Sequence, residues 1–450
     1  MPVMPLLSQR CCQSASRRDN GPVNRTNGGP GRGLRQVIGG AAAEGPARGA
    51  GGVNLLALRS HNSALVLDLL RTAGAEGISR LELAERTGLT PQAVSKITTR
   101  LREDGLAVEA GRRASTGGKP RTVLRLVPEA GHAVGVHLDR DGLRAVLSDL
   151  DGRVVADRRA PLHLGAGAEA VLTRVAEVVG ALGAPGAHGA GGGTGTAGGP
   201  VRTLLGVGVA LPGPLDHARG VLHRVTGYPD WDGFPLRDAL ADRLGAPVVV
   251  DKDTNAAALG LAVAGEGGSF AYLHLGTGLG AGLVIGGSVH RGPRTGAGEF
   301  GHQVVQLDGP RCPCGDRGCI EALCLDAVAR GDTEEAARVL GTGAANLVGL
   351  LDIDRVLLGG RTIEAAPDTF VRGVRAVLDA RARRTGDPPV TVRLASGDRT
   401  GNGSPGGGAR DGDREGGGSG AGPAAGDGAA GIAEGAAQLV LAPMFGRGDG

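Results

Sequence analysis

The chain has 450 residues, enough for two or three domains, and 41% of them are hydrophobic while only 2% are aromatic. The formal net charge of +3 favours no particular class of partner. The N-terminal residues lack the continuous apolar stretch of a signal peptide, and no apolar run approaches the ~18 residues that a membrane helix needs. These features exclude a membrane-spanning protein. We expect a cytoplasmic protein whose thiols stay reduced.

Gly-rich segments divide the chain, which contains 85 Gly residues. Residues 1–52 are rich in Gly, Arg, Asn and Pro without an apolar period, which predicts a disordered tail. Residues 183–200 contain 9 Gly in 18 positions, and residues 397–426 are similarly poor in large apolar side chains. We expect both of these segments to be flexible insertions on a folded body.

The first folded segment, residues 53–127, begins with two predicted helices. Leu55–Ala73 has apolar residues at helical spacing, which predicts the first helix. The second is predicted to begin at Ser79, which has Glu82 three residues later and so matches a capping box. It is predicted to end at Gly88, because Gly readily adopts the left-handed conformation that closes a helix.

The third predicted helix has the composition of a DNA-recognition helix. Thr90 caps it, and Pro91 occupies its first position, where a missing N–H costs nothing. Val94, Ile97 and Leu101 form one apolar stripe along this helix. The polar residues that then face outward, and that we expect to contact DNA, are Gln92, Ser95, Lys96, Thr99 and Arg100.

A basic hairpin follows, with predicted strands at Leu106–Glu109 and Thr122–Leu126. Residues suited to phosphate or minor-groove contact surround its Gly-rich tip, and they are Arg112, Arg113, Lys119 and Arg121. Residues 53–125 hold 12 Arg and Lys against 7 Asp and Glu. An ordinary three-helix bundle with a solvated hairpin could share the spacing. The caps, the spacing and the basic wing together favour a winged helix-turn-helix that binds double-stranded DNA.

The remaining chain alternates strand-like and helix-like segments. The strand-like apolar runs are Val134–Val136, Leu204–Ala210, Val248–Val250, Phe270–Leu275, Gly282–Ile285 and Val304–Leu307. Helix-like stretches include Leu236–Leu244 and Asn255–Ala264. This alternation indicates an α/β body. The turn Gly276–Gly282 lacks the spacing of a dinucleotide fingerprint, but the N–H groups of such a Gly-rich turn can approach a phosphate.

A possible metal site follows this turn. One His and three Cys fall within 18 residues, at His302, Cys312, Cys314 and Cys319. This set can supply four tetrahedral ligands, which predicts a structural zinc ion rather than a catalytic one with an open position. Cys324 is either a thiol buried on a helix or an alternative ligand. Cys11 and Cys12 lie in the predicted tail, and we assign them no role.

The body resembles the ROK family (repressors, open reading frames and sugar kinases), which has an actin/hexokinase-like, ribonuclease H-like fold of two lobes. The segments that carry the resemblance are Val207–Asp216, Trp231–Leu236, Asp251–Asn255, Gly276–Gly282, Gly298–His302, the Cys cluster and Arg355–Gly360. The match covers nearly all of residues 53–395, with a closing helix at 427–442. It implies a first lobe at 132–258 and a second lobe at 259–450, the latter containing the zinc loop 302–319 and the closing helix.

The resemblance also implies residue roles. Asp253 matches the base that deprotonates a sugar hydroxyl in the family's kinases. The positions that match sugar contacts are Asn255, Glu299, His302 and Glu321, with Lys252 beside them. The family's zinc ligands match His302, Cys312, Cys314 and Cys319. The glycines that match nucleotide-facing motifs are Gly278, Gly280 and Gly359.

Three departures from the family pattern bear on function. Kinases of the family begin the body with an Asp-x-Gly-Gly/Ala-Thr phosphate motif, where this chain has Val136–Asp141 with two carboxylates that would repel phosphate. We therefore expect no productive binding of ATP and Mg²⁺. Lys252 replaces an Asn, and it either pairs with Asp253 or favours an acidic or phosphorylated sugar. The segment after Glu321 is shorter than the family pattern, which would reshape the dimer surface or the sugar-site wall.

These observations predict a sugar-responsive, DNA-binding transcriptional regulator that represses genes of carbohydrate metabolism and is not an enzyme. We expect a homodimer or a dimer of dimers, because two operator half-sites need a two-fold reader. The alternative is an ATP-dependent, glucokinase-like sugar kinase that carries an accessory DNA-binding domain. Asp253 favours the kinase, and the missing phosphate motif opposes it.

Overall fold

The computed structural model describes residues 61–113, 121–140, 142–183, 203–223, 229–395 and 431–447. Outside the described residues lie the predicted tail, nearly all of the two Gly-rich insertions, Asp141, and the wing tip with Lys119. In the part of the chain that the structure describes, no helix combines the length and apolarity needed to cross a bilayer.

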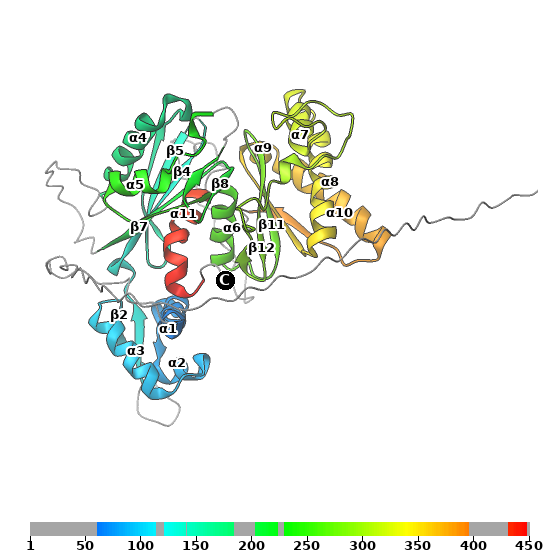
Figure 1. The fold of residues 1–450 in the computed structure, drawn as a ribbon. Coiled ribbons are helices and arrows are strands. Elements are labelled where there is room, and N and C mark those ends of the chain that lie inside the picture. The colour runs from blue at the N-terminus through cyan, green and yellow to red at the C-terminus, as the bar shows by residue number, and fades with distance from the viewer. Residues whose placement is uncertain are drawn as a thin grey trace, which may run out of the picture. The chain divides into compact units, whose positions relative to one another are not determined.

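The N-terminal elements form the predicted winged helix-turn-helix (Figure 1, blue to cyan). Its helices are α1 (His61–Ala73), α2 (Arg80–Thr87) and α3 (Pro91–Glu103). Its antiparallel sheet has the order β1-β3-β2, with β1 (Ile78–Ser79), β2 (Ala107–Arg113) and β3 (Arg121–Leu126). The short strand β1 was not predicted. It pairs Ile78 with Leu124 and so joins the start of α2 to the wing.

The predicted caps of α2 and α3 are confirmed. The Ser79 hydroxyl accepts a hydrogen bond from the Glu82 N–H at 3.3 Å, and the Glu82 carboxylate accepts one from the Ser79 N–H at 2.8 Å. Gly88 ends α2 in the left-handed conformation, with φ of 70°. The Thr90 hydroxyl accepts from the Ala93 N–H at 3.2 Å and caps α3. Caps of this kind are each worth about 1 kcal/mol, so the turn between α2 and α3 is locally encoded.

The first lobe is built on a five-stranded sheet of order β10-β7-β4-β5-β6 (Figure 1). Its strands are β4 (His132–Leu138), β5 (Gly142–Asp149), β6 (Val154–Pro161), β7 (Leu204–Leu211) and β10 (Val248–Lys252). Apolar side chains from this sheet pack against the helices α4 (Ala168–Gly180) and α5 (Leu236–Leu244). A small ribbon of β8 (Leu215–Asp216) and β9 (Val221–Leu222) lies between β7 and α5 in the chain.

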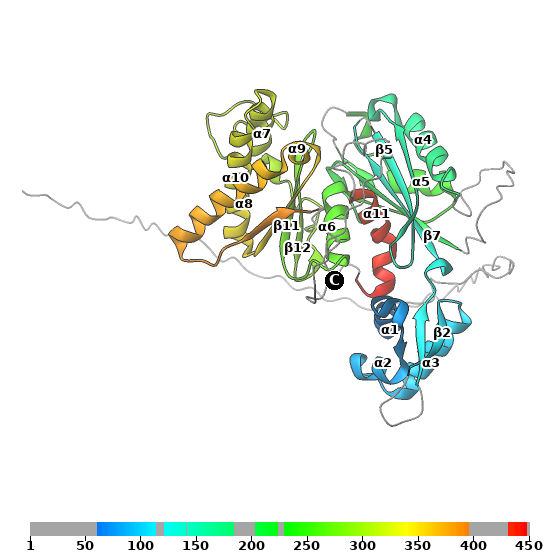
Figure 2. The same ribbon diagram turned by 180° about the vertical axis from the view of Figure 1, so that it is seen from behind.

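The second lobe (Figure 2, green to orange) repeats this topology. Its sheet has the order β13-β12-β11-β14-β15. Its strands are β11 (Phe270–Leu275), β12 (Leu279–Ile285), β13 (Ser288–Val289), β14 (Arg355–Gly359) and β15 (Thr391–Leu394). Its helices are α7 (Ile320–Ala329), α8 (Thr333–Leu351), α9 (Arg361–Ala365) and α10 (Pro367–Thr385). In each sheet the first three strands of the chain pair antiparallel in succession. The next two strands run parallel to the first and lie on its other side. The predicted two-lobed actin/hexokinase-like fold is thereby confirmed.

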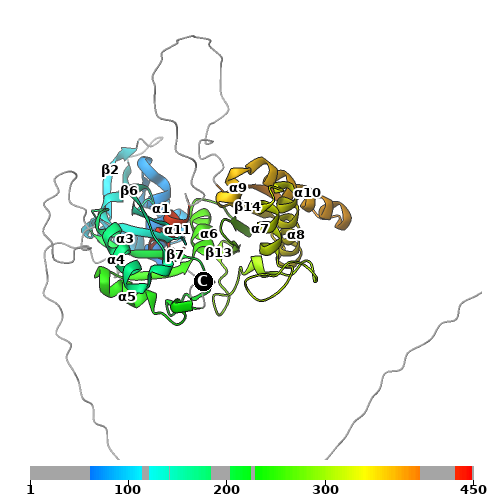
Figure 3. The same cartoon turned by 90° about the horizontal axis from the view of Figure 1, so that it is seen from above.

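Two helices lie between the sheets, α6 (Asp253–Val263) and α11 (Ile432–Leu441) (Figure 3). α6 packs on β11 and β12, whereas α11 packs on β4, β5 and β7 and along α6. The sequence placed the closing helix in the second lobe, but α11 covers the sheet of the first. A Cβ on Gly208 would lie 1.8 Å from the Ala436 carbonyl oxygen, so the α11 backbone rests directly on β7.

Two predicted elements differ from the structure. Val304–Leu307 was predicted as a strand, but only Val304 pairs, in an isolated bridge with Cys319. Leu307 is 86% exposed and Val304 is 42% exposed, while Val305 packs against the core of the second lobe. The apolar run therefore does not extend a sheet. The Gly-rich turn is also shorter than predicted, because β12 already begins at Leu279.

Candidate functional site

A cavity of about 270 Å³ lies between the lobes. The first lobe contributes residues at the ends of β4, β7 and β10, and the second contributes the β11–β12 turn and residues near the start of α7. The sequence-predicted residues that line the cavity are Lys252, Asp253, Gly278, Gly280, Glu299, His302 and Glu321. Asn255 and Gly359 are not among its lining residues.

Three carboxylates are held in the cavity by one oxygen each. The Asp253 Oδ1 atom accepts from the Thr254 N–H at 2.6 Å, at the first turn of α6. The Glu321 Oε2 atom accepts from the Leu279 N–H at 2.8 Å, and the Glu299 Oε1 atom accepts from Lys252. In the described part of the chain the second oxygen of each carboxylate has no hydrogen-bond partner. The cavity therefore offers three acceptors to a ligand rich in hydroxyl donors.

Lys252 pairs with Glu299 and not with Asp253, which corrects one of the two expectations for this residue. Its ammonium group donates to Glu299 Oε1 at 3.0 Å and to the Ala297 carbonyl oxygen at 2.5 Å, and its side chain is only 4% exposed. A Cβ on Gly213 would lie 2.8 Å from Lys252 Cδ, so the aliphatic part is also tightly packed. The charge of Lys252 is thus already neutralised inside the protein.

Asn255 is placed away from the cavity, contrary to the role implied by resemblance. It is fully buried, and its Nδ2 atom donates to Asp251 Oδ1 at 2.9 Å. The other oxygen of Asp251 accepts from Arg291 Nε at 2.7 Å and lies 3.7 Å from His217 Nδ1. Asn255 therefore belongs to a buried polar network that ties α6 and β10 to the loop before Glu299.

The predicted metal ligands come together. His302, Cys312, Cys314 and Cys319 place one ligand atom each within 4.8 Å of the others. His302 Nδ1 lies 3.6 Å from Cys312 Sγ, and Cys314 Sγ lies 3.7 Å from Cys319 Sγ. Ligands of a tetrahedral site with Zn–S bonds of ≈ 2.3 Å are about 3.8 Å apart, so the geometry fits a zinc ion.

Cys324 is the buried thiol and not an alternative ligand. It is fully buried on α7, and its Sγ atom lies 3.5 Å from the Ala336 carbonyl oxygen. Burial raises the pKa of Cys324 to about 12, so this thiol stays protonated and unreactive.

The sequence reasoning missed two histidines of the cavity, His137 and His274. They occupy the ends of β4 and β11, which are the first strands of the two equivalent sheets, and each is followed by a Leu. That repeated pair was the signal in the sequence that could have located them. Burial lowers the pKa of both histidines, against the opposing charges of Asp253 and Asp139. Neutral imidazoles thus line this part of the cavity.

Gly359 supports this part of the cavity from behind. A Cβ at Gly359 would lie 2.6 Å from the Tyr272 hydroxyl oxygen, which in turn lies 3.0 Å from His274 Nδ1. Gly359 therefore makes room for the Tyr272–His274 contact.

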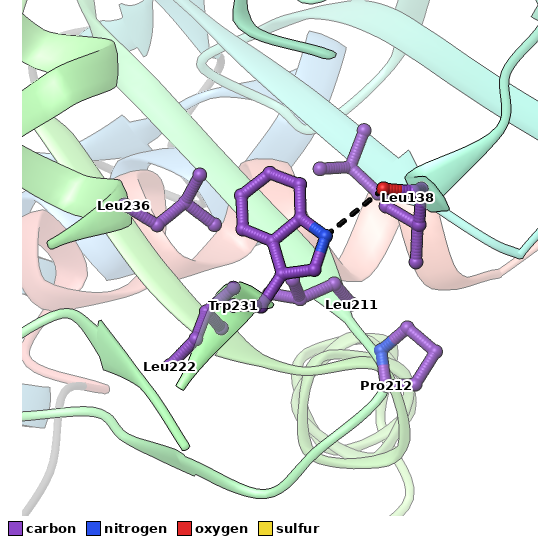
Figure 4. Close-up of a pocket in the computed structure, with 7 residues that line it drawn as sticks. Leu138, Leu211, Pro212, Leu222, Trp231 and Leu236 are labelled. Carbon is purple, nitrogen blue, oxygen red and sulfur yellow. Dashed lines mark hydrogen bonds between the residues drawn. The ribbon is translucent and has the colours of Figure 1, made fainter. Parts of the chain in front are cut away.

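The matching Trp231 segment builds the core of the first lobe (Figure 4). The Trp231 indole N–H donates to the Leu164 carbonyl oxygen at 3.0 Å, and its ring meets Phe234 edge-on. The apolar void beside it has a volume of about 10 Å³. It has room for no more than one water molecule, so we interpret this segment as structural.

The expected DNA-contacting face of α3 is open to solvent. Its five predicted side chains are all exposed, namely Gln92, Ser95, Lys96, Thr99 and Arg100. Arg112 and Arg121 are exposed on the wing strands, whereas Lys119 and the side chain of Arg113 lie outside the described part. Thr98 was overlooked: it is buried and accepts from Arg80 Nε at 3.2 Å, which joins α3 to α2.

Comparison with known proteins finds matches for both the two-lobed body and the winged helix-turn-helix. A family model described as "ROK family" matches residues 197–327, and one described as "Winged helix-turn-helix DNA-binding" matches residues 66–107. The putative xylose repressor of Caldicellulosiruptor sp. strain Rt8B.4 is 26% identical over 362 residues, which span 71% of this chain and 88% of that protein. The DNA-binding transcriptional dual regulator NagC of Escherichia coli K12 is 31% identical over 284 residues, or 61% of this chain and 64% of that protein.

A solved structure shares the fold. It is the crystal structure of a ROK family transcriptional regulator described as a homolog of the E. coli MLC protein. The match has a TM-score of 0.59 at 21% identity and covers 74% of this chain and 92% of that one.

Proposed function

Because this chain joins a ROK family domain to an N-terminal winged helix-turn-helix, we propose that it is a transcriptional repressor whose DNA binding responds to a sugar. One observation carries the proposal: the same chain presents an exposed polar face on a capped recognition helix and an interlobe cavity with three available carboxylate oxygens. The names of the relatives, a xylose repressor and the regulator NagC, support it.

We propose that the ligand is an uncharged sugar or sugar derivative. Asp253, Glu299 and Glu321 would accept hydrogen bonds from its hydroxyl groups, and the Nε2 atom of His302 would contact it while Nδ1 binds the metal. Lys252 offers no free charge to an acidic sugar, because Glu299 already neutralises it. Asp253 and Glu321 would repel a negative group.

A structural zinc ion would fix two of these groups. His302 follows Glu299 by three residues, and Cys319 immediately precedes α7, which carries Glu321 in its first turn. An ion bound by His302, Cys312, Cys314 and Cys319 would therefore hold both carboxylates in place. The chemistry it supplies is structural, since four protein ligands close a tetrahedral site.

We further propose a cytoplasmic homodimer or dimer of dimers. The α3 helix carries one set of exposed polar residues per chain, and a two-fold pair of such helices would read two half-sites one helical turn apart.

The test is binding of the purified protein to its own promoter region, with and without a panel of neutral sugars, at several salt concentrations. We expect salt-sensitive binding that one sugar weakens. Lys96→Ala should weaken it by roughly 1–3 kcal/mol if the ammonium reaches a base edge. Arg372→Ala, which removes an exposed cation from α10, is the matched control and should bind as the wild type does. Absence of salt-sensitive binding in the wild type would refute the proposal.

The runner-up is a sugar kinase, because Asp253 lies in the cavity as a catalytic base would. We propose that the cavity senses and does not phosphorylate, since His137 and Asp139, from the segment that replaces the kinases' phosphate motif, line the cavity. A coupled ADP-release assay with a panel of hexoses should show no turnover above the no-enzyme control. Turnover that Asp253→Asn abolishes would establish the kinase instead.

A further inference from the structure

Three parts of the chain meet beside the winged helix: α1, the last residue of α6, and the segment after η7 (Ala442–Phe445). Arg447 joins them. Its Nε and Nη2 atoms donate to the two oxygens of Asp68 on α1, both at 3.1 Å. Its Nη1 atom donates to the Val263 carbonyl oxygen at 3.4 Å, at the C-terminal end of α6. One guanidinium group thus spans two elements that are almost 200 residues apart in sequence.

Apolar packing between α1 and the C-terminal elements α11 and η7 supports this contact. Phe445 is 2% exposed, and the Arg71 guanidinium lies over its ring at 4.2 Å while donating to Asp68 Oδ1 at 3.0 Å. Ala437 and Leu441 of α11 belong to the same apolar cluster as three buried side chains of α1, namely Val66, Leu67 and Leu70. The first helix of the winged domain therefore rests on the C-terminal part of the body, with Asp68 at the edge of the contact.

The helices α6 and α11 connect this contact to the cavity. α6 begins at Asp253, which lines the cavity, and ends at Val263, beside Arg447. It packs without intervening side chains on α11, since a Cβ on Gly435 would lie 1.9 Å from the Ala256 carbonyl oxygen. Backbones in such close contact have no side chains between them to absorb a displacement. A movement of α6 would therefore be shared by α11 and η7.

From this geometry we infer that Arg447 is the positioning residue through which ligand occupancy of the cavity sets the orientation of the DNA-binding domain. The guanidinium fork fixes the direction of Asp68 through two parallel hydrogen bonds, which a single charge would not do. The third hydrogen bond of Arg447 is donated to the carbonyl group of Val263 at the C-terminal end of α6, where the helix carbonyl groups favour a cation. The inference rests on the proposed function, because it requires that the ligand and DNA bind the same chain.

The test compares the wild type with Arg447→Gln, Asp68→Asn and the double variant. For each we measure the sugar dissociation constant, the promoter dissociation constant without sugar, and the ratio of promoter constants with and without sugar. We expect the first two constants to stay within about threefold of the wild type. The ratio should fall at least fivefold in either single variant and no further in the double variant, as typical coupling factors of 5–150 allow.

The matched control is Arg338→Gln. It removes a guanidinium that also bonds both oxygens of one carboxylate, at 2.7 Å each, but on α8 and with Glu335. This control should leave the ratio unchanged, and so should every variant if the pair merely stabilises the fold. An unchanged ratio in Arg447→Gln, or a fall that only tracks a loss of thermal stability, would overturn the inference. A wild type that binds DNA with no response to any sugar would instead refute the proposed function.

Discussion

We expect the wild type to bind about one zinc ion per chain. The replacement Cys319→Ser is expected to abolish this binding and to lower the melting temperature by roughly 10 °C. The His302–Cys312–Cys314–Cys319 cluster closes a loop that the structure otherwise holds by turn-type backbone hydrogen bonds and two isolated bridges. An ion present at 1,000 times its dissociation constant contributes about 4 kcal/mol to the free energy of unfolding. For a domain of this size, each kcal/mol corresponds to about 2–4 °C.

Elemental analysis and thermal unfolding on the same preparation give the measurement. Cys324→Ser is the control, because that thiol lies five residues further on yet bonds to Ala336 and not to the cluster. It should retain the zinc. The sugar dissociation constant should rise in Cys319→Ser, since Glu299 and Glu321 lose their common support. Wild-type protein that is free of metal and fully folded would contradict the prediction.

The second large effect is expected for Gly435→Val, which should reduce the free energy of unfolding by about 3 kcal/mol, the upper end of the usual cost of overpacking. Even the Cβ would lie 1.9 Å from the Ala256 carbonyl oxygen and 2.5 Å from the Ala256 carbonyl carbon, so α11 has to move away from α6. Because α11 also covers β4 and β7, that movement opens the core of the first lobe. Chemical denaturation, read as a shift of the midpoint at constant slope, measures the change.

Gly431→Ser provides the control for the same helix. Gly431 is the N-cap of α11, and a Cβ there meets nothing within 4 Å. Ser is a favoured N-cap residue, so this variant should match or slightly exceed the wild type in stability. An unchanged denaturation midpoint in Gly435→Val would show that the two helices are not in contact as described.

Features encoded by neighbouring residues were predictable from the sequence. The caps at Ser79 and Thr90 depend on residues three positions away, and the four residues that could hold a metal ion fall within 18 residues of each other. The fold of the body followed from motifs that resemble a known family. In each of these cases the residues that determine the feature either lie close together in the chain or form a set of motifs that is known from one family.

Features that depend on distant partners were not predictable. Lys252 meets Glu299 across 47 positions, and nothing near Lys252 in the sequence distinguishes this partner from the adjacent Asp253. Asn255 was assigned to the cavity because of its position in a motif, but the buried carboxylate of Asp251 takes its amide group. Val304–Leu307 has the apolar content of a strand, but among the described residues it forms only an isolated bridge, between Val304 and Cys319.

The position of α11 also determines the order in which the parts of the chain can finish folding during synthesis. Its residues Ala437 and Leu441, with Phe445 of η7, fill the apolar cluster of the winged domain, which includes Leu70. About 370 residues separate Leu70 from Leu441, so synthesis at 5–20 residues per second leaves roughly 20–70 seconds between them. During that interval the nascent winged domain lacks part of its core. A ribosome-bound chain is therefore expected to complete the core of its winged domain only after both lobes have been made.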